Sequence, residues 1–572
     1  MNSNVIRFRI LLGFLCLWAF ILSVKLYSVQ IVHGEEYIKQ ADNQYTKPSS
    51  VFERGSIFFE TKDGTRVSVA GIKEGWNVVM NPMLTKDPAL AYETLSQYVK
   101  IDRDSFLEKA KKVNDQYEEL EKHIDQNTGI AIGEINIPGI NVLKENWRVY
   151  PGNSLASHTI GLVGYDKTDK VAGRYGLERY YENILGRTTE LSNVNFFAEL
   201  FANIGGDIFQ GQNSVKKKEG NIIVTIEPTV QNELEKILKE TQNMWRSDSI
   251  GGIIMNPKTG EIYAMASRPT FDLNNLNDVS DPYIFSNQLV EGVYEMGSII
   301  KPLTMAAGID SKAITAESTY DDTGFLILNN KRIANWDNKA RGVISMQEVL
   351  NQSLNIGAAN VALKVGAEDF TRYFLSFGLG ELTGIDQPNE LKGKVSNLKT
   401  GREIEQATAS YGQGIAMSPI ATVRALSIIA NGGLLIEPHL AKKIEYMDGT
   451  TEEIISDLGV RVIQKETAED VTRMLVEVVD TALRKGTVKM THYSIAAKTG
   501  TAQIAAPAIR GYYEDKFLHS FFGYFPAYNP KHIIFLYHIY PKDVKYASET
   551  LTNPFMDMTK FLINYYDIPP DR

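Results

Sequence analysis

A long apolar segment near the N-terminus is the first pattern along the chain. Arg7 and Arg9 precede an apolar run over residues 10–24, and more apolar residues follow Lys25. Because a helix needs about 20 apolar residues to cross a bilayer, Lys25 must extend its amine to the outer interface. Basic residues before a span place the N-terminus in the cytoplasm. We predict a single transmembrane anchor, with all later residues outside.

A cleaved signal peptide is the competing interpretation of this segment. Cleavage requires small residues at a fixed spacing after the apolar run, and the sequence offers no good match. The uncleaved anchor is therefore favoured, and no second apolar run of comparable length follows.

Residues 34–218 mix strand-like and helical patterns. Residues 76–80 form a strand-like run, and a later stretch has apolar side chains three or four positions apart with charged residues between them. That period predicts one amphipathic helix packed on its own domain. Its apolar positions are Phe106, Ala110, Val113, Tyr117, Leu120 and Ile124. The charged residues 216–220 predict a linker that ends this region.

Strand patterns lie at both ends of the remaining chain, with helical sequence between them. Residues 221–226 predict a strand, and residues 228–238 predict a helix. Two pairs of apolar runs, each separated by a turn with proline, are typical of hairpins. These pairs are 251–255 with 261–266 and 520–525 with 533–540. The distribution favours an α+β domain whose sheet is assembled from both ends.

Composition narrows the class of protein. The chain has 572 residues, of which 43% are hydrophobic and 23% charged, so we expect at least two globular domains. The net charge is −9 without a basic stripe, which argues against nucleic acid as a partner. The one cysteine, Cys16, lies in the apolar segment, so an intramolecular disulfide and a thiolate-rich zinc site are excluded. No motif implies a metal or an organic cofactor.

Ser298, followed three positions later by Lys301, is the first motif that carries chemistry. Residues three apart share a helix face, so the hydroxyl and the amine can meet within hydrogen-bond distance. A serine attacks only after a base takes its proton, and a lysine is that base when burial or positive charge lowers its pKa. Gly297 allows close approach of the chain at the helix start. Alone, this pair is weak evidence, because it occurs by chance in many proteins.

Ser353 and Asn355 form a second motif at a predicted break between two helices. Ser345 and Glu348 make a capping-box pattern that starts a helix upstream, and helical sequence continues over residues 360–365. A break of this kind presents a hydroxyl and an amide to a cleft.

The third motif follows a strand-like run over residues 494–497 and consists of Lys498, Thr499, Gly500 and Thr501. A strand edge at this place can pair with an extended peptide substrate. Lys498 would supply charge, and Gly500 would leave room for the substrate.

Each motif alone is common, but the three in this order behind a membrane anchor are a strong signal. They match the signature of class A β-lactamases and penicillin-binding proteins, with Leu354 at the centre of the middle motif. Over nearly its whole length the chain resembles a class B penicillin-binding protein of the division-type, FtsI-like branch. Further segments that carry the resemblance are 54–57, 63–64, 148–151, 161–164, 176–178, 185–186, 257–261, 410–414 and 521–524.

The resemblance implies a role for each motif residue. Ser298 would be the acylated nucleophile and Lys301 its general base. Ser353 and Asn355 would serve the proton relay and hold the substrate amide.

The resemblance also implies how the substrate is held. Lys498 and Thr499 would steer the substrate carboxylate, beside Gly500. The backbone N–H groups of Ser298 and Thr501 would form the oxyanion hole. The expected reaction cross-links peptidoglycan stem peptides that end in D-Ala-D-Ala, and β-lactams would block the serine covalently.

The same resemblance implies the domain organisation and the partners. Residues 1–33 would be the cytoplasmic tail and signal anchor, residues 34–218 a mixed α/β pedestal domain of the dimerisation type, and residues 219–572 an α+β transpeptidase domain like that of serine β-lactamases. The protein would be single-pass in the cytoplasmic membrane, with its catalytic domain outside. Expected partners are a SEDS-family glycan polymerase and other membrane proteins of the divisome.

The chain departs from the usual family pattern beside the nucleophile. Met296 replaces a proline and Ile299 a threonine, while Glu60 and Thr61 replace an Asp-Arg pair. The first two changes predict an altered affinity for β-lactams with the Ser-x-x-Lys frame intact.

Three alternatives share the motifs. A β-lactamase has no need of the region 34–218, and a D,D-carboxypeptidase differs from a transpeptidase only in its products. A catalytically decayed scaffold of the division machinery is disfavoured, because all three motifs are intact.

Overall fold

Two compact units make up the protein, each formed by separated stretches of chain. The computed structural model describes residues 3–27, 52–112, 114–165, 167, 171–187, 218–277, 279–455, 459–506 and 511–572. The smaller unit includes Ile72–Trp147, and the larger one comprises Arg54–Gly71, Arg148–Arg187 and Gly211–Arg572. The larger unit is thus assembled from three segments of the sequence. Residues 216 and 217 of the predicted linker lie outside the described residues.

Helix α1 spans Ser3–Tyr27 at the N-terminus. No helix among the described residues combines the length with the apolar character that a membrane crossing requires. The anchor over residues 1–33 therefore stays a prediction from the sequence.

The smaller unit packs three helices on three strands. Strand β2 (Arg66–Met80) pairs antiparallel with β3 (Glu118–Ile124) and also pairs with β4 (Ile140–Val149). The helices share a buried apolar cluster with these strands, in which Phe106 is 0% exposed. They are α3 (Pro88–Leu95), α4 (Arg103–Ala110) and α5 (Gln126–Ile135).

The single helix predicted over positions 106–124 is wrong in its second half. Helix α4 ends at Ala110, and the side chains of Leu120 and Ile124 belong to strand β3. Residues four apart share a face in a helix and also in a strand, so this apolar spacing did not distinguish the two. Val113 lies outside the described residues.

One sheet of the larger unit joins segments far apart in the sequence. Strand β1 (Ile57–Glu60) pairs antiparallel with the first part of β2 and parallel with β7 (Gly220–Val224). Strand β15 (Ala441–Tyr446) pairs with β7, and β16 (Thr451–Glu453) pairs with β15. The strand predicted after the linker is therefore confirmed as β7, in the middle of a sheet.

A buried ion cluster joins two of the three segments of the larger unit, because Arg54 lies in the first and Arg148 and Glu178 lie in the second. The two arginines donate Nε to separate carboxylate oxygens of Glu178, at 2.6 and 2.7 Å. The side chains of Arg54 and Glu178 are 1% and 0% exposed, and that of Arg148 is 2% exposed. Arg54 also donates to the carboxylate of Glu182. Since the buried Glu178 carboxylate and the partly exposed Glu182 carboxylate together balance the two guanidinium charges, each member depends on the others.

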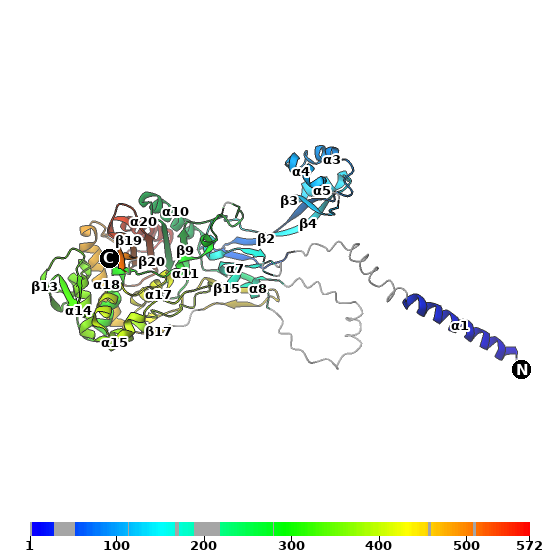
Figure 1. Ribbon diagram of the computed structural model, residues 1–572. Helices are drawn as coiled ribbons and strands as arrows, with labels where there is room; N and C mark the ends of the chain where they lie inside the picture. Colours follow the sequence, from blue (N-terminus) through cyan, green and yellow to red (C-terminus); the bar gives the residue numbers. More distant parts are fainter. Residues whose placement is uncertain are drawn as a thin grey trace. The chain divides into compact units, whose positions relative to one another are not determined.

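A five-stranded antiparallel sheet forms the centre of the larger unit, in the order β18-β19-β20-β8-β9 (Figure 1). Both predicted strand pairs are confirmed, because β8 pairs with β9 and β19 pairs with β20. The sheet is assembled from both ends of the C-terminal region, as its sequence predicts. The strands are β8 (Ser249–Met255), β9 (Ile262–Arg268), β18 (Ala496–Ala506), β19 (Gly511–Phe525) and β20 (His532–Ile539).

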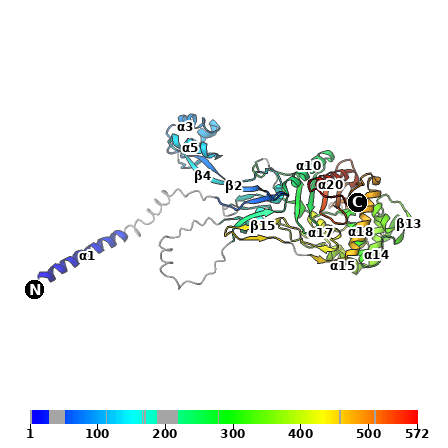
Figure 2. The same ribbon diagram turned by 180° about the vertical axis from the view of Figure 1, so that it is seen from behind.

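Helices cover both faces of this sheet (Figures 1 and 2). On one face, α10 (Pro228–Trp245) and α20 (Thr552–Tyr565) share a buried apolar cluster with Ile254. The adjacent Ile253 belongs to a second cluster on the other face. The helices that share this cluster are α12 (Lys301–Asp310), α14 (Asn355–Val365), α17 (Pro419–Ala430) and α18 (Lys465–Glu477). Consecutive strand residues point to opposite faces, so burial of both faces accounts for the nearly continuous apolar runs. The helix predicted over residues 228–238 is α10, which extends further.

The remaining elements surround this core. The helices are α6 (Ser157–Ile160), α7 (Gly176–Tyr180), α8 (Glu182–Leu185), α11 (Gln288–Glu291), α12 (Lys301–Asp310), α13 (Met346–Asn351), α14 (Asn355–Val365), α15 (Ala367–Ser376), α16 (Glu403–Ala409), α17 (Pro419–Ala430), α18 (Lys465–Glu477) and α19 (Ala547–Thr550). The short strands are β5 (Val163–Tyr165), β6 (Val171–Gly173), β10 (Thr319–Asp322), β11 (Phe325–Leu328), β12 (Lys331–Ala334), β13 (Gly342–Ser345), β14 (Leu434–Leu435) and β17 (Val460–Arg461).

The ion cluster predicts a large stability effect at Glu178. In Glu178→Gln two buried guanidinium groups face a neutral amide, and we expect the free energy of unfolding to fall by about 3–5 kcal/mol. Denaturant unfolding of the full-length protein measures the change. The control is Asp369→Asn, which breaks an ion pair with Arg372 whose side chains are 53% and 62% exposed. It should cost at most about 1 kcal/mol, and equal effects of the two variants would contradict the expectation.

Candidate active site

The nucleophile candidate Ser298 lies on a tight turn at the start of a helix. A 3-10 turn over Gly297–Ile300 leads directly into α12, which begins with Lys301. Gly297 has φ +66°, and a Cβ atom there would lie 2.9 Å from the carbonyl oxygen of Thr501. Glycine is therefore required by both the backbone conformation and the space. The turn brings the Lys301 Nζ atom to 3.0 Å from Ser298 Oγ, as the spacing predicts.

The Lys301 amine is fully buried and meets only uncharged acceptors. Besides Ser298 Oγ, Nζ donates to the Ser353 carbonyl at 2.6 Å, to Ser353 Oγ at 3.3 Å and to Asn355 Oδ1 at 2.9 Å. Burial lowers the pKa of this amine well below its usual value, and the positive charge of Lys498 lowers it further. Both effects favour the neutral amine, which is the form that accepts a proton.

Ser353 lies in the connection between α13 and α14, and Asn355 is the first residue of α14, so the predicted helix break is confirmed. Ser345 caps α13 by accepting from the Glu348 N–H at 3.4 Å, in agreement with the capping pattern. Ser353 itself has φ +56°, a left-handed conformation that is uncommon for residues other than glycine. This backbone aims both the hydroxyl and the carbonyl of Ser353 at the Lys301 amine.

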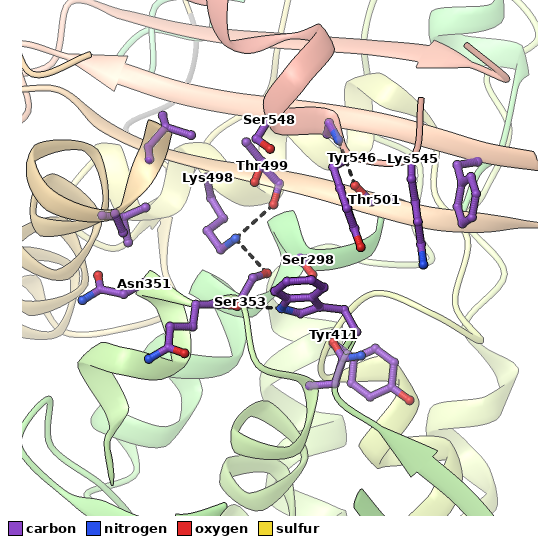
Figure 3. A pocket seen from close by; sticks show the side chains of 18 of the residues that line it. Ser298, Asn351, Ser353, Tyr411, Lys498, Thr499, Thr501, Lys545, Tyr546 and Ser548 are labelled. Atoms are coloured by element: carbon purple, nitrogen blue, oxygen red, sulfur yellow. Dashed lines mark hydrogen bonds between the residues drawn. The ribbon is translucent and has the colours of Figure 1, made fainter. Parts of the chain in front are cut away.

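Lys498 lies on β18, the edge strand of the central sheet. Its Nζ atom donates to Ser353 Oγ at 3.0 Å, so one hydroxyl receives hydrogen bonds from two lysine amines. Lys498 is 3% exposed, and burial lowers the pKa of its amine to about 7. Figure 3 shows Lys498 and Thr499 above Ser353, with Ser298 beside them.

Gly500 keeps β18 close to the nucleophile turn. A Cβ atom at this position would lie 2.7 Å from the Met296 carbonyl oxygen and 2.4 Å from Ser520 Oγ. Ser520 Oγ holds that same carbonyl through a 2.7 Å hydrogen bond. Thr501 follows on β18, and its Oγ1 accepts from the Ala547 N–H at 3.1 Å.

The motif residues surround a cavity of about 460 Å³. Ser298, Ser353, Asn355, Lys498, Thr499 and Thr501 line it, together with four aromatic residues outside the three motifs. Those are Trp336, Tyr411, Phe517 and Tyr546. The Trp336 and Tyr546 rings meet edge to face with centroids 5.4 Å apart. Tyr411 lies in the segment 410–414 that carries the family resemblance, but no local motif marks Trp336, Phe517 and Tyr546, which distant segments bring together.

The two departures beside the nucleophile are packed in the interior. Met296 and Ile299 are both 0% exposed and belong to the large apolar cluster. They therefore contact the site through packing and through the backbone of the turn. Glu60, the other departure, forms an ion pair with Lys442.

A serine beside a buried lysine, with a second serine that joins two lysine amines, defines a class of serine enzymes that act through an acyl intermediate. Residues 250–558 match the family model of the penicillin binding protein transpeptidase domain. Residues 51–225 match that of the penicillin-binding protein dimerisation domain. The chain belongs to the penicillin-binding protein transpeptidase family, as a class B member: a serine-type D,D-transpeptidase of cell wall synthesis.

Relatives with similar sequences support this family assignment. The chain is 28% identical to stage V sporulation protein D of Bacillus subtilis, over 94% of this chain and 82% of that one. It is 24% identical to the peptidoglycan D,D-transpeptidase FtsI of Buchnera aphidicola, over 99% and 96% of the two chains.

Solved structures share the fold. Penicillin binding protein 2X from Streptococcus thermophilus has a TM-score of 0.73 at 20% identity, over 91% of this chain and 81% of that one. Penicillin binding protein 3 from Mycobacterium tuberculosis, solved with aztreonam, has a TM-score of 0.67 at 22% identity, over 91% and 98%.

Burial of Lys498 predicts a stability effect that depends on pH. The pKa of its amine falls from 10.5 to about 7 on folding, so between these values the unfolded chain binds a proton that the folded site lacks. The free-energy cost of burying the Lys498 amine is therefore largest below about pH 7, and it disappears as the pH rises towards 10.5. Lys498→Met should therefore raise the melting temperature most near neutral pH, with a gain that shrinks towards alkaline pH.

Thermal melting of the full-length protein across this pH range measures the effect. The control is Lys485→Met, which replaces an exposed lysine. A gain in Lys498→Met that does not vary with pH would contradict the assigned burial cost.

Proposed function

We propose that Ser298 attacks the D-Ala-D-Ala bond of a stem peptide and that Lys301 is the base that takes its proton. The distance of 3.0 Å between Lys301 Nζ and Ser298 Oγ is the observation that carries this proposal. The amine lies among uncharged acceptors, and its lowered pKa supports a neutral, proton-accepting state. A hydroxyl with such a base in contact needs no metal to become a nucleophile.

Ser353 and Asn355 are proposed to relay protons and to hold the substrate amide. Ser353 Oγ lies between Lys301 and Lys498, so it can pass a proton between the two amines and the leaving amine of the substrate. Asn355 Nδ2 donates to the Ala334 carbonyl at 3.0 Å, which leaves Oδ1 directed at Lys301.

Lys498 and Thr499 are proposed to bind the terminal carboxylate of the donor peptide. The backbone N–H groups of Ser298 and Thr501 are proposed as the oxyanion hole, and Gly500 leaves room for the peptide beside β18. A donor peptide that adds to this edge strand would gain main-chain hydrogen bonds.

The proposed reaction has two steps. The Ser298 oxygen forms an ester with the penultimate D-alanine, and the terminal D-alanine leaves with the proton that Lys301 had taken. An amine of a neighbouring stem peptide then attacks the ester and forms the cross-link, and one of the amine's own protons passes to the Ser298 oxygen. A β-lactam would acylate the same oxygen, and the serine would stay blocked because the acyl group is not passed on to an acceptor.

The wider setting is also proposed. We assign residues 1–33 to a cytoplasmic tail and single-pass anchor, residues 34–218 to a pedestal domain and residues 219–572 to the transpeptidase domain outside the membrane. A SEDS-family glycan polymerase and other divisome proteins are the proposed partners. Protease accessibility in intact spheroplasts tests this topology.

Septal wall synthesis in division is the proposed role, supported by the similarity to FtsI. Wall synthesis during sporulation is a second candidate, because the Bacillus subtilis relative is named a sporulation protein. Depletion that causes filamentous growth supports the first role, and a defect confined to spores supports the second.

Labelling by a fluorescent penicillin tests the nucleophile and the base. Wild-type protein should form a stable adduct, and Ser298→Ala none, because the attacking oxygen is missing. Lys301→Ala should slow acylation by about 10² to 10⁴ fold, the usual contribution of a positioned base. Lys364→Ala, at an exposed lysine, is the control and should label like the wild type. Wild-type labelling of Lys301→Ala would refute the assignment of the base.

Product analysis separates the proposed activity from its alternatives. With a D-Ala-D-Ala donor and an acceptor amine, we expect a cross-linked product together with free D-alanine. Release of D-alanine without any cross-link would instead establish a carboxypeptidase, and rapid hydrolysis of penicillin would establish a β-lactamase.

A further inference from the structure

The left-handed backbone of Ser353 needs support from outside its own connection. A serine has no glycine-like freedom at φ +56°, and such a residue keeps its conformation only where neighbouring groups hold it. The connection between α13 and α14 is too short to supply that support alone.

Three consecutive residues, 334–336, each make one hydrogen bond to the residues that flank Ser353. They lie at the end of β12 and directly after it. The three bonds join the Ala334 carbonyl to Asn355 Nδ2 at 3.0 Å, Asn335 Oδ1 to the Ile356 N–H at 3.1 Å and Trp336 Nε1 to the Gln352 carbonyl at 3.0 Å. Ser353 is thus held from both sides.

A buried carboxylate fixes the central residue of this set. Asp322 is 0% exposed, and its two oxygens accept from Asn335 Nδ2 at 3.0 and 2.9 Å. Asn335 Nδ2 also donates to the Lys339 carbonyl at 3.2 Å. Because the amide nitrogen must face these acceptors, Oδ1 must face the Ile356 N–H. Asp322 therefore determines how Asn335 holds the first turn of α14.

We propose that Asp322 and Asn335 are positioning residues for acylation, which act by holding the connection that carries Ser353 and the start of α14, where Asn355 lies. This inference rests on the proposed roles of Ser298 and Lys301. Among the described residues, neither Asp322 nor Asn335 is hydrogen-bonded to Lys301. The segment that they hold supplies three of the acceptors of the Lys301 amine: the Ser353 carbonyl, Ser353 Oγ and Asn355 Oδ1. Loss of the Asp322–Asn335 contact should misplace these acceptors and slow the chemical step more than it weakens binding.

An exchange of the two side chains provides the sharpest test. Asp322→Asn keeps one oxygen that can accept from Asn335 Nδ2 but puts an NH2 group in place of the other, so two amide donors face each other. Asn335→Asp places two carboxylates together in the interior. In the double variant the new amide at 322 can donate to the new carboxylate at 335, which still accepts from Ile356. The double variant should therefore recover most of the function that each single variant loses.

The experiment measures the acylation of the full-length protein by penicillin in a stopped-flow instrument. It determines two separate quantities, the limiting rate of acylation and the dissociation constant of the non-covalent complex that precedes it. We expect each single variant to lower the limiting rate by at least tenfold and up to about 10² fold, with a dissociation constant within about threefold of the wild type. The double variant should lie within about fivefold of the wild-type rate. Melting temperatures are measured in parallel so that rates are compared per folded molecule.

Matched controls make the same chemical changes on exposed neighbours. Asp321→Asn and Asn330→Asp should acylate at the wild-type rate. Wild-type limiting rates in both single variants, or a double variant slower than either single variant, would overturn the positioning role. Loss that falls mainly on the dissociation constant would overturn it as well. A wild-type protein that is not acylated at Ser298 would instead overturn the proposed function and this inference with it.

Discussion

Two lysine amines are buried around a single serine hydroxyl, and the organisation of the catalytic cleft follows from that constraint. An amine removed from water must keep hydrogen-bond acceptors, or the fold loses several kcal/mol. Lys301 and Lys498 find those acceptors in hydroxyl, carbonyl and amide oxygens, none of which carries a charge. A carboxylate in the same place would hold both amines in the charged form. The neutral acceptors satisfy the amines and leave them ready to take a proton.

The acceptors come from a connection that is itself under conformational strain. Ser353 supplies its hydroxyl and its carbonyl to the lysines because its backbone is left-handed. Residues 334–336 hold the flanking residues, and the buried carboxylate of Asp322 orients the middle one. The strand-rich segment that precedes α13 therefore belongs functionally to the cleft, although only Trp336 lines the cavity. A strained catalytic residue and the network that holds it form one unit.

The ion cluster of Arg54, Arg148 and Glu178 shows the opposite use of buried charge. There, two guanidinium groups are balanced by the carboxylates of Glu178 and Glu182, and the cluster joins segments far apart in the sequence. The catalytic lysines lack such a partner, so the cost of their burial lowers their pKa values. Compensated charge thus stabilises the larger unit, and uncompensated charge makes the cleft reactive.

The sequence by itself determined the strand pairs of the central sheet, the helix break at Ser353 and the contact of Ser298 with Lys301. Each of these rests on local spacing or on continuous apolar runs, which short-range physics decides. Local spacing failed at Leu120 and Ile124, where an interval of four residues suits a strand as well as a helix. Only the tertiary structure decided that β18 lies at the sheet edge, that Asp322 and Asn335 hold the second motif, and that Trp336 and Tyr546 meet at the cavity. Those contacts join residues from 13 to about 200 positions apart, and no period along the chain encodes them.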